Sequence, residues 1–347
     1  MLDANGFRRQ TETGSGELHS AATHAHGGGA SAGYVNFITN KFWAGAHCFV
    51  VKPVDKEINN RFLYFFLKNI QEHIQNAKHG AGIPGLSREK LKKIPLPLPP
   101  LPIQEEIVRI LDTFTELEAE LEAELEARKK QYEYYRNKLL TPTEKNGKWY
   151  LNGKEVEWKK VKEICKNITS GGTPLTSKTE YYEGTIPWLR TQEINWKNIY
   201  DTKIKITEEG LKNSSAKIIP PNCIIVAMYG ATAGKVAINK IPLSTNQACC
   251  NLEIDEDQAY YRYVFYWLYN SYGNIKALGE GTQSNINSGK IKNFPIPLPP
   301  LSEQERIVAI LDKFDALVND ISQGLPAEIE ARRKQYEYYR NKLLTFK

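Results

Sequence analysis

The stretch RKKQYEYYRNKLLT, residues 128–141, decides the architecture because it returns almost unchanged as RRKQYEYYRNKLLT at residues 332–345. Each copy ends a long stretch that begins at a proline-rich ladder, IPLPLPPLPIQEEIVRILD from Ile94 and FPIPLPPLSEQERIVAILD from Phe294. The ladders stand 200 residues apart (294 minus 94), and the tyrosine-rich ends stand 204 apart (332 minus 128). A repeat at a fixed period indicates one structural unit written twice. The second copy of the helical stretch is four residues longer than the first.

The stretches that follow the ladders are predicted to be helices that pair with each other. The ladder prolines exclude helix, because proline fixes φ and biases the preceding residue toward extended backbone. Beyond the first ladder, apolar residues alternate in spacing between four and three, which makes a coiled-coil seam of Ile103, Ile107, Ile110, Phe114, Leu117 and Leu121. The second seam contains Ile307, Ile310, Phe314, Leu317 and Ile321. Gly324 and Pro326 then predict a kink or break. Each helix is the obvious partner of the other.

The first helix also contains a shorter repeat. Between residues 117 and 127 the chain reads LEAE, LEAE, LEA, a four-residue unit in tandem. Such a unit adds about 6 Å to a helix and turns it by roughly 400°, which is a little more than one full turn.

The two ladders and helices divide the chain into six predicted segments. Residues 1–33, rich in Gly, Ala, Ser and His, lack apolar periodicity and are predicted to be disordered. His24 and His26 have no Cys, Asp or Glu cluster beside them, so no metal site is predicted. The remaining segments are a partial first domain (34–100), a first helix (101–141), a linker or hairpin with two Asn-Gly turns (142–155), a complete second domain (156–298) and a second helix (299–347). The predicted fold class is α+β, with α/β domains joined by two long coiled-coil helices.

Composition permits a nucleic-acid partner without demanding one. The 46 Lys and Arg residues exceed the 40 Asp and Glu residues, which gives a net charge of +6. There is no apolar run of about 18 residues and no signal-peptide core, so a cytoplasmic location is expected. The five cysteines form no C-x-x-C pair and are predicted to be reduced, mostly buried thiols.

Motifs for catalysis are missing from the sequence. It contains no glycine-rich methyltransferase cofactor loop, no N/D-P-P-Y/F motif and no phosphate-binding loop. It also lacks a zinc-protease motif, a paired-cysteine zinc pattern and a G-x-S-x-G elbow. The chain is therefore predicted to be non-catalytic and to hold no metal.

Three polar segments of the second domain have the composition of a DNA-reading surface. Arg and Gln side chains bind the edges of guanine and adenine in the major groove, and loop amides, hydroxyls and lysines suit phosphate contacts. The segments are TIPWLRTQEINWKN, MYGATAGK and GTQSNINSGKIK, beginning at residues 185, 228 and 281. The candidate DNA-binding residues are Trp188, Arg190, Thr191, Gln192, Asn195, Tyr229, Thr232, Lys235, Thr282, Gln283, Ser284, Asn285, Asn287 and Lys290.

The repeated sequences resemble the conserved regions of the specificity (S) subunit of type I restriction-modification enzymes. The resemblance is very close for residues 94–141 and 294–345, and PWLRTQEI, MYGATAGK and TQSNIN are placed as in a target recognition domain of that family. It implies two recognition domains that each read half of a split site in double-stranded DNA. It also implies an antiparallel pair of helices that docks two adenine-methylating M subunits, with R subunits joining the complex. S-adenosylmethionine, ATP and Mg²⁺ are then expected on the partner subunits and no cofactor on this chain.

The tyrosine-rich ends offer aromatic and arginine anchors of the kind that are enriched at interfaces. The candidate partner-binding residues are Gln131, Tyr132, Tyr135, Arg136, Gln335, Tyr336, Tyr339 and Arg340.

The first domain departs from the family pattern, because only residues 34–93 precede its ladder and no counterparts of PWLRTQEI and MYGATAG are apparent. It is predicted to be truncated, so DNA contact is expected mainly from residues 156–293. An alternative function is an assembly scaffold that binds methyltransferase subunits without reading a bipartite site.

Overall fold

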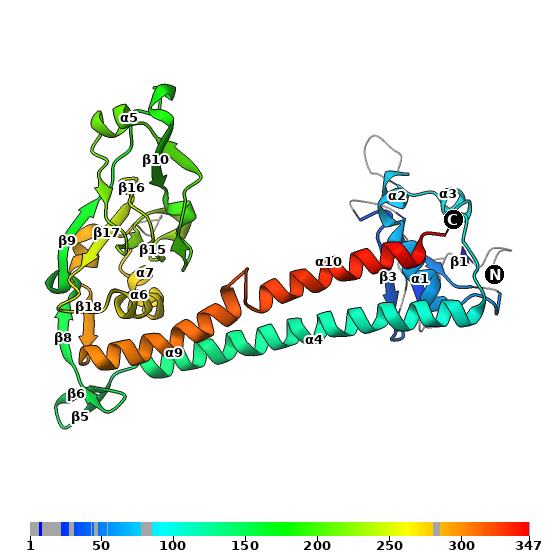
Figure 1. Ribbon diagram of the computed structural model, residues 1–347, viewed down its shortest axis with the longest axis horizontal. Coiled ribbons are helices and arrows are strands. Elements are labelled where there is room, and N and C mark those ends of the chain that lie inside the picture. Colours follow the sequence, from blue (N-terminus) through cyan, green and yellow to red (C-terminus); the bar gives the residue numbers. More distant parts are fainter. Residues whose placement is uncertain are drawn as a thin grey trace. The chain divides into compact units, whose positions relative to one another are not determined.

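The computed structural model describes residues 7–8, 22–27, 31–42, 44, 48–53, 55–77, 85–279 and 285–346. The chain divides into two compact units, and one of them combines both ends of the sequence. Unit 1 contains residues 1–126 and 319–347, and unit 2 contains residues 127–318. Each unit is a sheet-containing domain attached to long helices (Figure 1). The division falls inside α4 (Leu101–Leu140), so this helix contributes its first part to unit 1 and its last part to unit 2.

Unit 1 is built on a four-stranded sheet with the order β1-β4-β2-β3, in which all neighbours are antiparallel. Its strands are β1 (Phe7–Arg8), β2 (Ala22–His26), β3 (Val35–Ile38) and β4 (Cys48–Val51). Its helices besides α4 are α1 (Asn60–Asn69), α2 (Gln71–Asn76), α3 (Arg88–Lys92) and α10 (Leu325–Leu344). Helix α1 begins where the Asn59 side chain accepts hydrogen bonds from two backbone N–H groups. Its Phe62 and Phe65 are buried against apolar residues of α4 and α10.

Unit 2 contains a larger domain with two main sheets, of order β12-β10-β16-β13 and β11-β15-β14-β17-β9. The first includes β10 (Tyr182–Leu189), β12 (Ile204–Ile206), β13 (Ile218–Ile219) and β16 (Leu243–Thr245). The second includes β9 (Cys165–Ser170), β11 (Asn198–Ile199), β14 (Ile224–Ala227), β15 (Val236–Asn239) and β17 (Cys249–Ile254). A two-stranded sheet joins β8 (Glu157–Lys160) to β18 (Pro295–Leu298). The helices are α5 (Glu208–Lys212), α6 (Tyr261–Asn270), α7 (Tyr272–Ala277), α8 (Ser288–Lys292) and α9 (Leu301–Asn319).

The segment between α4 and the second domain is a three-stranded meander. Its strands are β5 (Thr143–Lys145), β6 (Lys148–Leu151) and β7 (Lys154–Glu155). Both Asn-Gly turns have positive φ at both residues, with 54° and 76° at Asn146 and Gly147, and 51° and 81° at Asn152 and Gly153. This is the backbone that a two-residue hairpin of this type requires. Of the two predicted alternatives, a linker or a hairpin, the structure contains the hairpin.

The sheet of unit 1 repeats part of the larger sheet of unit 2 strand for strand. Strands β4, β2 and β3 correspond to β17, β14 and β15, with residue numbers that differ by 201. The outer strands also match, because Val51 faces Phe7 of β1 and Leu252 faces Ile168 of β9. The two domains differ in the segment between the first two strands, which is long in unit 2 (171–223) and short in unit 1 (9–21).

One sequence-based expectation for the N-terminal segment therefore needs correction, and a second one is not confirmed. Residues 22–26 are not disordered, because they form β2, which pairs with both β3 and β4. The expected truncation of the first domain at its start is not confirmed. The domain has its own sheet and core, and the difference from unit 2 lies within it. Its residues 9–21 lie outside the described part of the chain.

The two units contain equivalent aromatic clusters that set the pairing of the helices. In unit 1, Phe114 of α4 packs on Tyr336 and Tyr339 of α10, with ring centroids 6.3 and 5.5 Å apart. In unit 2, Phe314 of α9 packs on Tyr132 and Tyr135 of α4, at 6.2 and 5.3 Å. The path from one cluster to the other runs from position 114 to 132 on α4 and from 314 to 336 on the second helical stretch. The second path is therefore longer by four residues.

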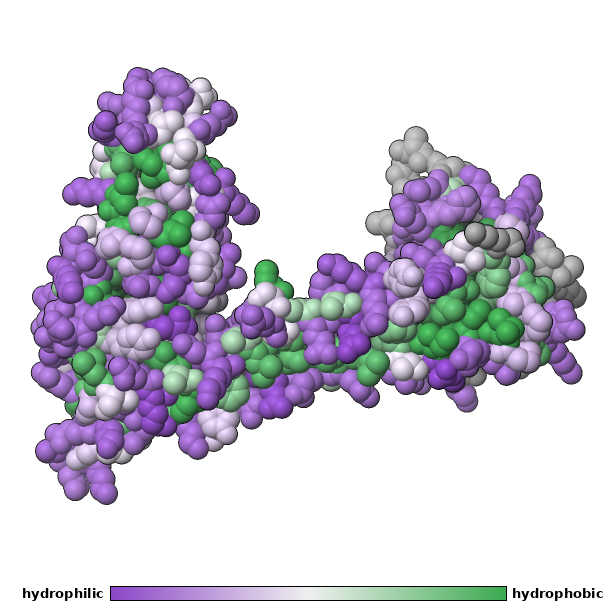
Figure 2. Space-filling model, in the orientation of Figure 1, coloured by the Kyte–Doolittle hydropathy of each residue, from purple (hydrophilic) through white to green (hydrophobic). Residues whose placement is uncertain are grey.

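A turn between α9 and α10 takes up these four extra residues. Helix α9 ends at Asn319 and α10 begins at Leu325, which confirms the predicted break. The Asp320 carboxylate holds the turn by accepting hydrogen bonds from the backbone N–H groups of Ser322 and Gln323, at 2.7 and 3.3 Å. Figure 2 shows an apolar projection at this turn. Ile321 is 86% exposed, so its predicted place in the seam is wrong. It leaves the seam because the helix must lose four residues to keep both clusters in register.

Candidate DNA-contact surface and helix anchors

The three polar segments that the sequence singled out meet in unit 2. The Thr232 hydroxyl, in the short helix η4 (Gly230–Thr232), donates to the carbonyl of Thr191 in η3 (Thr191–Glu193) at 2.9 Å. The N–H of Ile286, at the end of the third segment, donates to the carbonyl of Met228 at 2.8 Å. Segments that are far apart in the sequence therefore share one surface.

A glycine hairpin lies at the centre of this surface, between β14 and β15. Gly230 and Gly234 have φ values of 79° and 85°, a backbone region that side chains rarely adopt. The Gly234 N–H donates to Ala227 at 2.8 Å, and the Ala227 N–H donates back to Lys235 at 2.9 Å. A methyl group at Gly234 would also meet the Tyr272 ring at 3.3 Å. The two glycines therefore fix how the loop presents its polar residues.

A cavity of about 320 Å³ opens beside η3 and η4. Its lining includes three lysines, Lys197, Lys203 and Lys235, and two carboxylates, Glu193 and Asp201. The exposed amides of Gln192 and Asn195 also line it. The Lys235 ammonium donates to Asn195 Oδ1 at 2.7 Å, and the Lys203 backbone N–H donates to Glu193 Oε2 at 2.9 Å. The lining thus offers amide, ammonium and hydroxyl groups together, a chemistry that suits base edges and phosphates.

Two buried polar atoms in this segment have no hydrogen-bond partner among the described residues, Nε of Arg190, which directly precedes η3, and Oε1 of Glu193, which lines the cavity. Most buried polar groups in proteins have a partner, so these unpaired atoms favour a site that a ligand completes.

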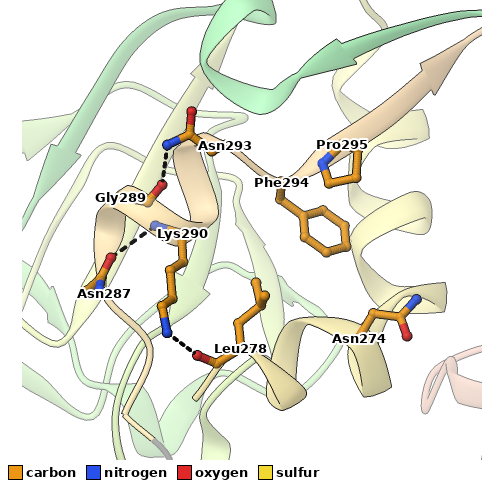
Figure 3. Close-up of a pocket in the computed structure, with 8 residues that line it drawn as sticks. All are labelled: Asn274, Leu278, Asn287, Gly289, Lys290, Asn293, Phe294 and Pro295. Carbon is orange, nitrogen blue, oxygen red and sulfur yellow. Dashed lines mark hydrogen bonds between the residues drawn. The ribbon is translucent and has the colours of Figure 1, made fainter. Parts of the chain in front are cut away.

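Some of the predicted DNA-binding residues are buried or make hydrogen bonds within the chain. Trp188 is 4% exposed, and its Nε1 donates to the Gly172 carbonyl at 2.9 Å, so the ring belongs to the core. Thr191 is 8% exposed. Lys290 donates to the Leu278 carbonyl at the end of α7, at 2.7 Å, and the Asn287 side chain caps α8 by accepting from the Lys290 N–H at 3.0 Å (Figure 3).

The other predicted contacts are exposed or lie outside the described residues. Tyr229 is 41% exposed, and Asn285 is also exposed. Thr282, Gln283 and Ser284 fall in the part of the chain that the structure does not describe.

Unit 1 carries the same glycine hairpin, which the sequence analysis missed. Gly33 has a φ of 82°, its N–H donates to His26 at 2.7 Å, and the His26 N–H donates to Tyr34 at 3.0 Å. The residues whose numbers are higher by 201, Gly234, Ala227 and Lys235, make the same two hydrogen bonds in unit 2. The Leu86 N–H donates to Gly27 at 2.9 Å, as Ile286 does to Met228. The sequence signal is GASAG at 29–33 against GATAG at 230–234. The expectation that a counterpart of MYGATAG is missing is therefore wrong.

The eight residues predicted to bind partner subunits all make contacts within the chain. Besides the tyrosines of the two clusters, Arg340 Nε donates to Asn69 Oδ1 at 3.1 Å in unit 1, and Arg136 Nε donates to Asn270 Oδ1 at 3.3 Å in unit 2. Gln335 and Gln131 accept from arginines of their own helices at 3.2 and 2.8 Å. Tyr132 is 4% exposed and has no surface to offer a partner. The tyrosine-rich ends are therefore anchors that hold each domain on its helices.

Ion pairs complete each anchor. In unit 1, Arg61 of α1 binds Asp112 of α4 at 2.7 Å, and its guanidinium lies 4.9 Å from the centre of the Phe65 ring. In unit 2, Arg262 of α6 binds Asp312 of α9 at 2.5 Å, and the Tyr266 hydroxyl donates to the same carboxylate at 2.6 Å. Tyr266 corresponds to Phe65 (266 minus 201), so only unit 2 adds a hydroxyl to the pair.

Buried glutamines fix the start of each helix in the same way. Gln104 accepts from the Asn59 N–H at 2.8 Å and donates to the Pro99 carbonyl at 2.8 Å. Gln304 accepts from the Tyr260 N–H at 2.9 Å and donates to the Pro299 carbonyl at 2.9 Å. Both glutamines are 1% exposed. The repeated ladder sequences thus encode the same connection between domain and helix in both units.

The described residues contain no group of three His, Cys, Asp or Glu side chains that would hold a metal ion. All five cysteines are free thiols, as predicted. Burial raises the pKa of Cys165 and of Cys223 to about 12, which disfavours the reactive thiolate. Among the described residues, no helix combines the length and apolarity needed to cross a bilayer.

Two domains with the same glycine hairpin, each anchored to one long helical pair, define a duplicated recognition protein. A family model described as the type I restriction modification DNA specificity domain matches residues 19–127 and 153–331. The chain belongs to this family. It is 40% identical over 298 residues to the Escherichia coli EcoR124I/EcoR124II specificity subunit, covering 82% of this chain and 70% of the relative. It is 36% identical over 325 residues to a putative type I restriction enzyme specificity subunit of Haemophilus influenzae, covering 90% and 78%.

Solved structures have the same fold. The type I restriction-modification S subunit of M. genitalium superposes with a TM-score of 0.60 at 17% identity, covering 100% of this chain and 92% of that one. The HsdS subunit of Thermoanaerobacter tengcongensis superposes with a TM-score of 0.52 at 16% identity, covering 96% and 83%. These similarities confirm the α+β fold with long helices.

Proposed function

We propose that this chain is the DNA-recognition subunit of a type I restriction-modification complex and directs methyltransferase and restriction subunits to a bipartite target site in double-stranded DNA. The observation that carries the proposal is the glycine hairpin, which occurs in both units with the same three backbone hydrogen bonds. The first domain therefore has the framework of a reading surface and is not only an anchor for the helices. This observation disfavours the assembly scaffold.

The chemistry of modification belongs to the partners in this proposal. The chain itself is non-catalytic, and its described residues supply amide, hydroxyl, ammonium and guanidinium groups for binding DNA. S-adenosylmethionine, ATP and Mg²⁺ are bound by partner subunits. Because its substrate is cellular DNA, the complex has a cytoplasmic location.

The proposal is tested by producing the chain with its cognate methyltransferase subunit and sequencing the methylated adenines. We expect a split motif with two specified parts. Exchanging residues 156–293 for those of another specificity subunit should change one part and leave the other unchanged. A single contiguous motif, or a motif determined entirely by residues 156–293, would contradict reading by both domains.

Lys235→Ala should weaken DNA binding at all sequences, whereas Lys290→Ala should not. The Lys235 ammonium lies at the polar cavity and has two N–H donors besides the one that binds Asn195, so it can contact a phosphate. Its loss should lower the slope of log Kd against log salt concentration by about one unit. Lys290 instead bonds the end of α7. Its replacement should lower the melting temperature and leave the salt slope unchanged. Binding measured by fluorescence anisotropy at several salt concentrations, with both variants compared, distinguishes the two roles.

A further inference from the structure

In unit 2, a stack of three side chains connects a long helix to a loop of the polar surface. Trp196 stands between Asn195 and Lys197, which both line the polar cavity. Its ring stacks on Tyr269 of α6, with centroids 4.2 Å apart and planes 14° apart. The guanidinium of Arg136, in α4, lies 4.1 Å from the centre of the same tyrosine ring. Two groups this close to one ring centre cannot share a face, so Tyr269 lies between the other two.

The backbone of Trp196 is strained, and its neighbours hold it in place. Its φ of 57° lies in a region that bulky residues rarely adopt. Its N–H donates to the carbonyl of Val236 in β15 at 3.0 Å, beside the edge at which β11 joins the sheet. Tyr272 of α7 meets Trp196 edge-on, with centroids 5.0 Å apart, and also packs against Gly234 of the glycine hairpin. Such strain persists only where the surroundings enforce it, and it concentrates at functional sites. The stack therefore fixes the loop and the hairpin in one arrangement.

Unit 1 binds the equivalent carbonyl with a lysine. Val35 of β3 corresponds to Val236 (236 minus 201), and β3 is the outer strand of the described sheet. Lys68 of α1 stands at the position of Tyr269 (269 minus 201), and its ammonium donates to the Val35 carbonyl at 3.2 Å. The ammonium also donates to Gln71 Oε1 at 3.0 Å, and the same oxygen accepts from the Val35 N–H at 2.9 Å. One lysine thus does in unit 1 what the aromatic stack does in unit 2.

Both supports reach from a helical anchor to the glycine hairpin. In unit 1, the Lys68 ammonium lies 4.2 Å from the centre of the Tyr34 ring, and Tyr34 is the hairpin residue that corresponds to Lys235. The next residue of α1, Asn69, accepts the hydrogen bond from Arg340, the counterpart of Arg136. Water would satisfy a carbonyl at the edge of a sheet, so folding alone requires neither a strained tryptophan nor a half-buried lysine. Different side chains at equivalent places indicate that the hairpin itself must be held.

We propose that Trp196 and Lys68 are positioning residues for DNA recognition, each of which holds the glycine hairpin of its own unit in the orientation that reads its half of the site. This inference rests on the proposed function. Trp196 packs its ring on two tyrosines, and Lys68 uses two of its N–H donors within the chain, so both act through the hairpin. Base contacts depend on exact geometry, whereas phosphate contacts depend mainly on charge. Loss of either support should therefore reduce discrimination between bases and leave the attraction to phosphates unchanged.

The test uses the full-length chain with its cognate methyltransferase subunit, on duplexes that carry one changed base pair in either half of the wild-type motif. Fluorescence anisotropy measures the affinity for each duplex and for unrelated DNA. Trp196→Gly removes the ring, and glycine adopts the positive φ without strain. It should lower discrimination about tenfold in the half read by unit 2 and leave the other half unchanged. Lys68→Met keeps the length of the side chain without the ammonium and should do the reverse. Lys56→Met is the matched control, because it removes an exposed charge of unit 1 next to the Gln104 anchor, and it should change neither half.

Two further variants separate positioning from direct contact and from folding. Trp196→Phe keeps a ring on Tyr269 and should retain discrimination. Tyr269→Leu leaves the polar loop intact but removes the middle of the stack, so it should act like Trp196→Gly. The two changes combined should cost no more than either alone, because they remove the same stack.

Several results would overturn the inference and leave the proposed function intact. These are unchanged discrimination in Trp196→Gly and Lys68→Met, additive effects of Trp196→Gly and Tyr269→Leu, or an equal loss of affinity for cognate and unrelated DNA. A salt slope that falls by about one unit in Lys68→Met would make this lysine a phosphate contact and would overturn it as well. Failure of the wild-type chain to specify a split motif would instead overturn the proposed function.

Discussion

Asp312→Ala should lower the free energy of unfolding of unit 2 by about 3 kcal/mol. The carboxylate accepts hydrogen bonds from Arg262 Nε at 3.1 Å, from Arg262 Nη2 at 2.5 Å and from the Tyr266 hydroxyl at 2.6 Å. The Arg262 side chain is 16% exposed, Asp312 is 36% exposed, and Tyr266 is fully buried. Without the carboxylate, a mostly buried guanidinium and a fully buried hydroxyl are left with no acceptor, and this is the main cost.

Unit 1 provides the matched control for this substitution. Asp112→Ala removes the equivalent carboxylate, but the Arg61–Asp112 pair has side chains that are 28% and 32% exposed, and Phe65 replaces the tyrosine. We expect a loss of about 1 kcal/mol there. Hydrogen exchange monitored by mass spectrometry in increasing urea reports each unit separately. Equal losses in the two units would show that burial and the Tyr266 hydroxyl do not determine the strength of the anchor.

Inserting one Leu-Glu-Ala-Glu unit into α4 after Glu124 should be tolerated, whereas inserting only Leu-Glu should cost several kcal/mol. Four residues turn a helix by roughly 400° and two residues by roughly 200°. The longer insertion leaves both aromatic clusters on nearly the same side of α4. It also makes the spacing between the clusters equal on the two helical stretches, so the Asp320–Gln323 turn can straighten. The shorter insertion places one cluster on the wrong side.

The loss of one cluster should be visible in both stability and spectroscopy. Burying Phe114 against two tyrosines is comparable to other large aromatic contacts, whose removal costs about 3–5 kcal/mol. Urea denaturation gives the free energy, and near-ultraviolet circular dichroism reports the packing of the tyrosines. If the two insertions destabilised the chain equally, helix phase would not be what holds the clusters in register.

The sequence predicted the features that are encoded by a long-period repeat, by proline and glycine, or by a regular apolar spacing. The long-period repeat, the ladder prolines and the alternating apolar spacing predicted two long helical stretches, and Gly324 and Pro326 predicted a kink or break in the second. The structure contains α4 as one stretch, and α9 and α10, separated after Asn319, as the other. The resemblance carried by the tyrosine-rich ends predicted the family. These signals are strong because each depends on many residues or on a backbone restriction that only proline or glycine imposes.

Other features depended on tertiary contacts that no local pattern encodes. Ile321 has the spacing of a coiled-coil seam residue. It lies in the turn between α9 and α10, however, because the second helical stretch is four residues longer than the first. Tyr132 and Arg136 are residue types that are common at interfaces, and in the structure they contact Phe314 and Asn270 of the same chain. β2 escaped notice because THAHGGG resembles a disordered tract. Comparing GASAG with GATAG at the known offset of 201 would have identified it, since a Gly at positive φ marks the same hairpin in both domains.

The make-up of unit 1 has a consequence for biosynthesis. Its core joins Phe62, Phe65, Ile107 and Leu111 to Leu344, which is 3% exposed. Unit 2 needs only residues 127–318. On a ribosome that adds about 5–20 residues per second, the domain that is translated first must wait until position 344 has been made before its hydrophobic surface is covered. The later domain can be finished sooner. A stop codon shortly before residue 344 would therefore remove part of the core of the N-terminal domain. During synthesis, chaperones would bind the N-terminal domain, because its apolar surface is exposed for the longest time.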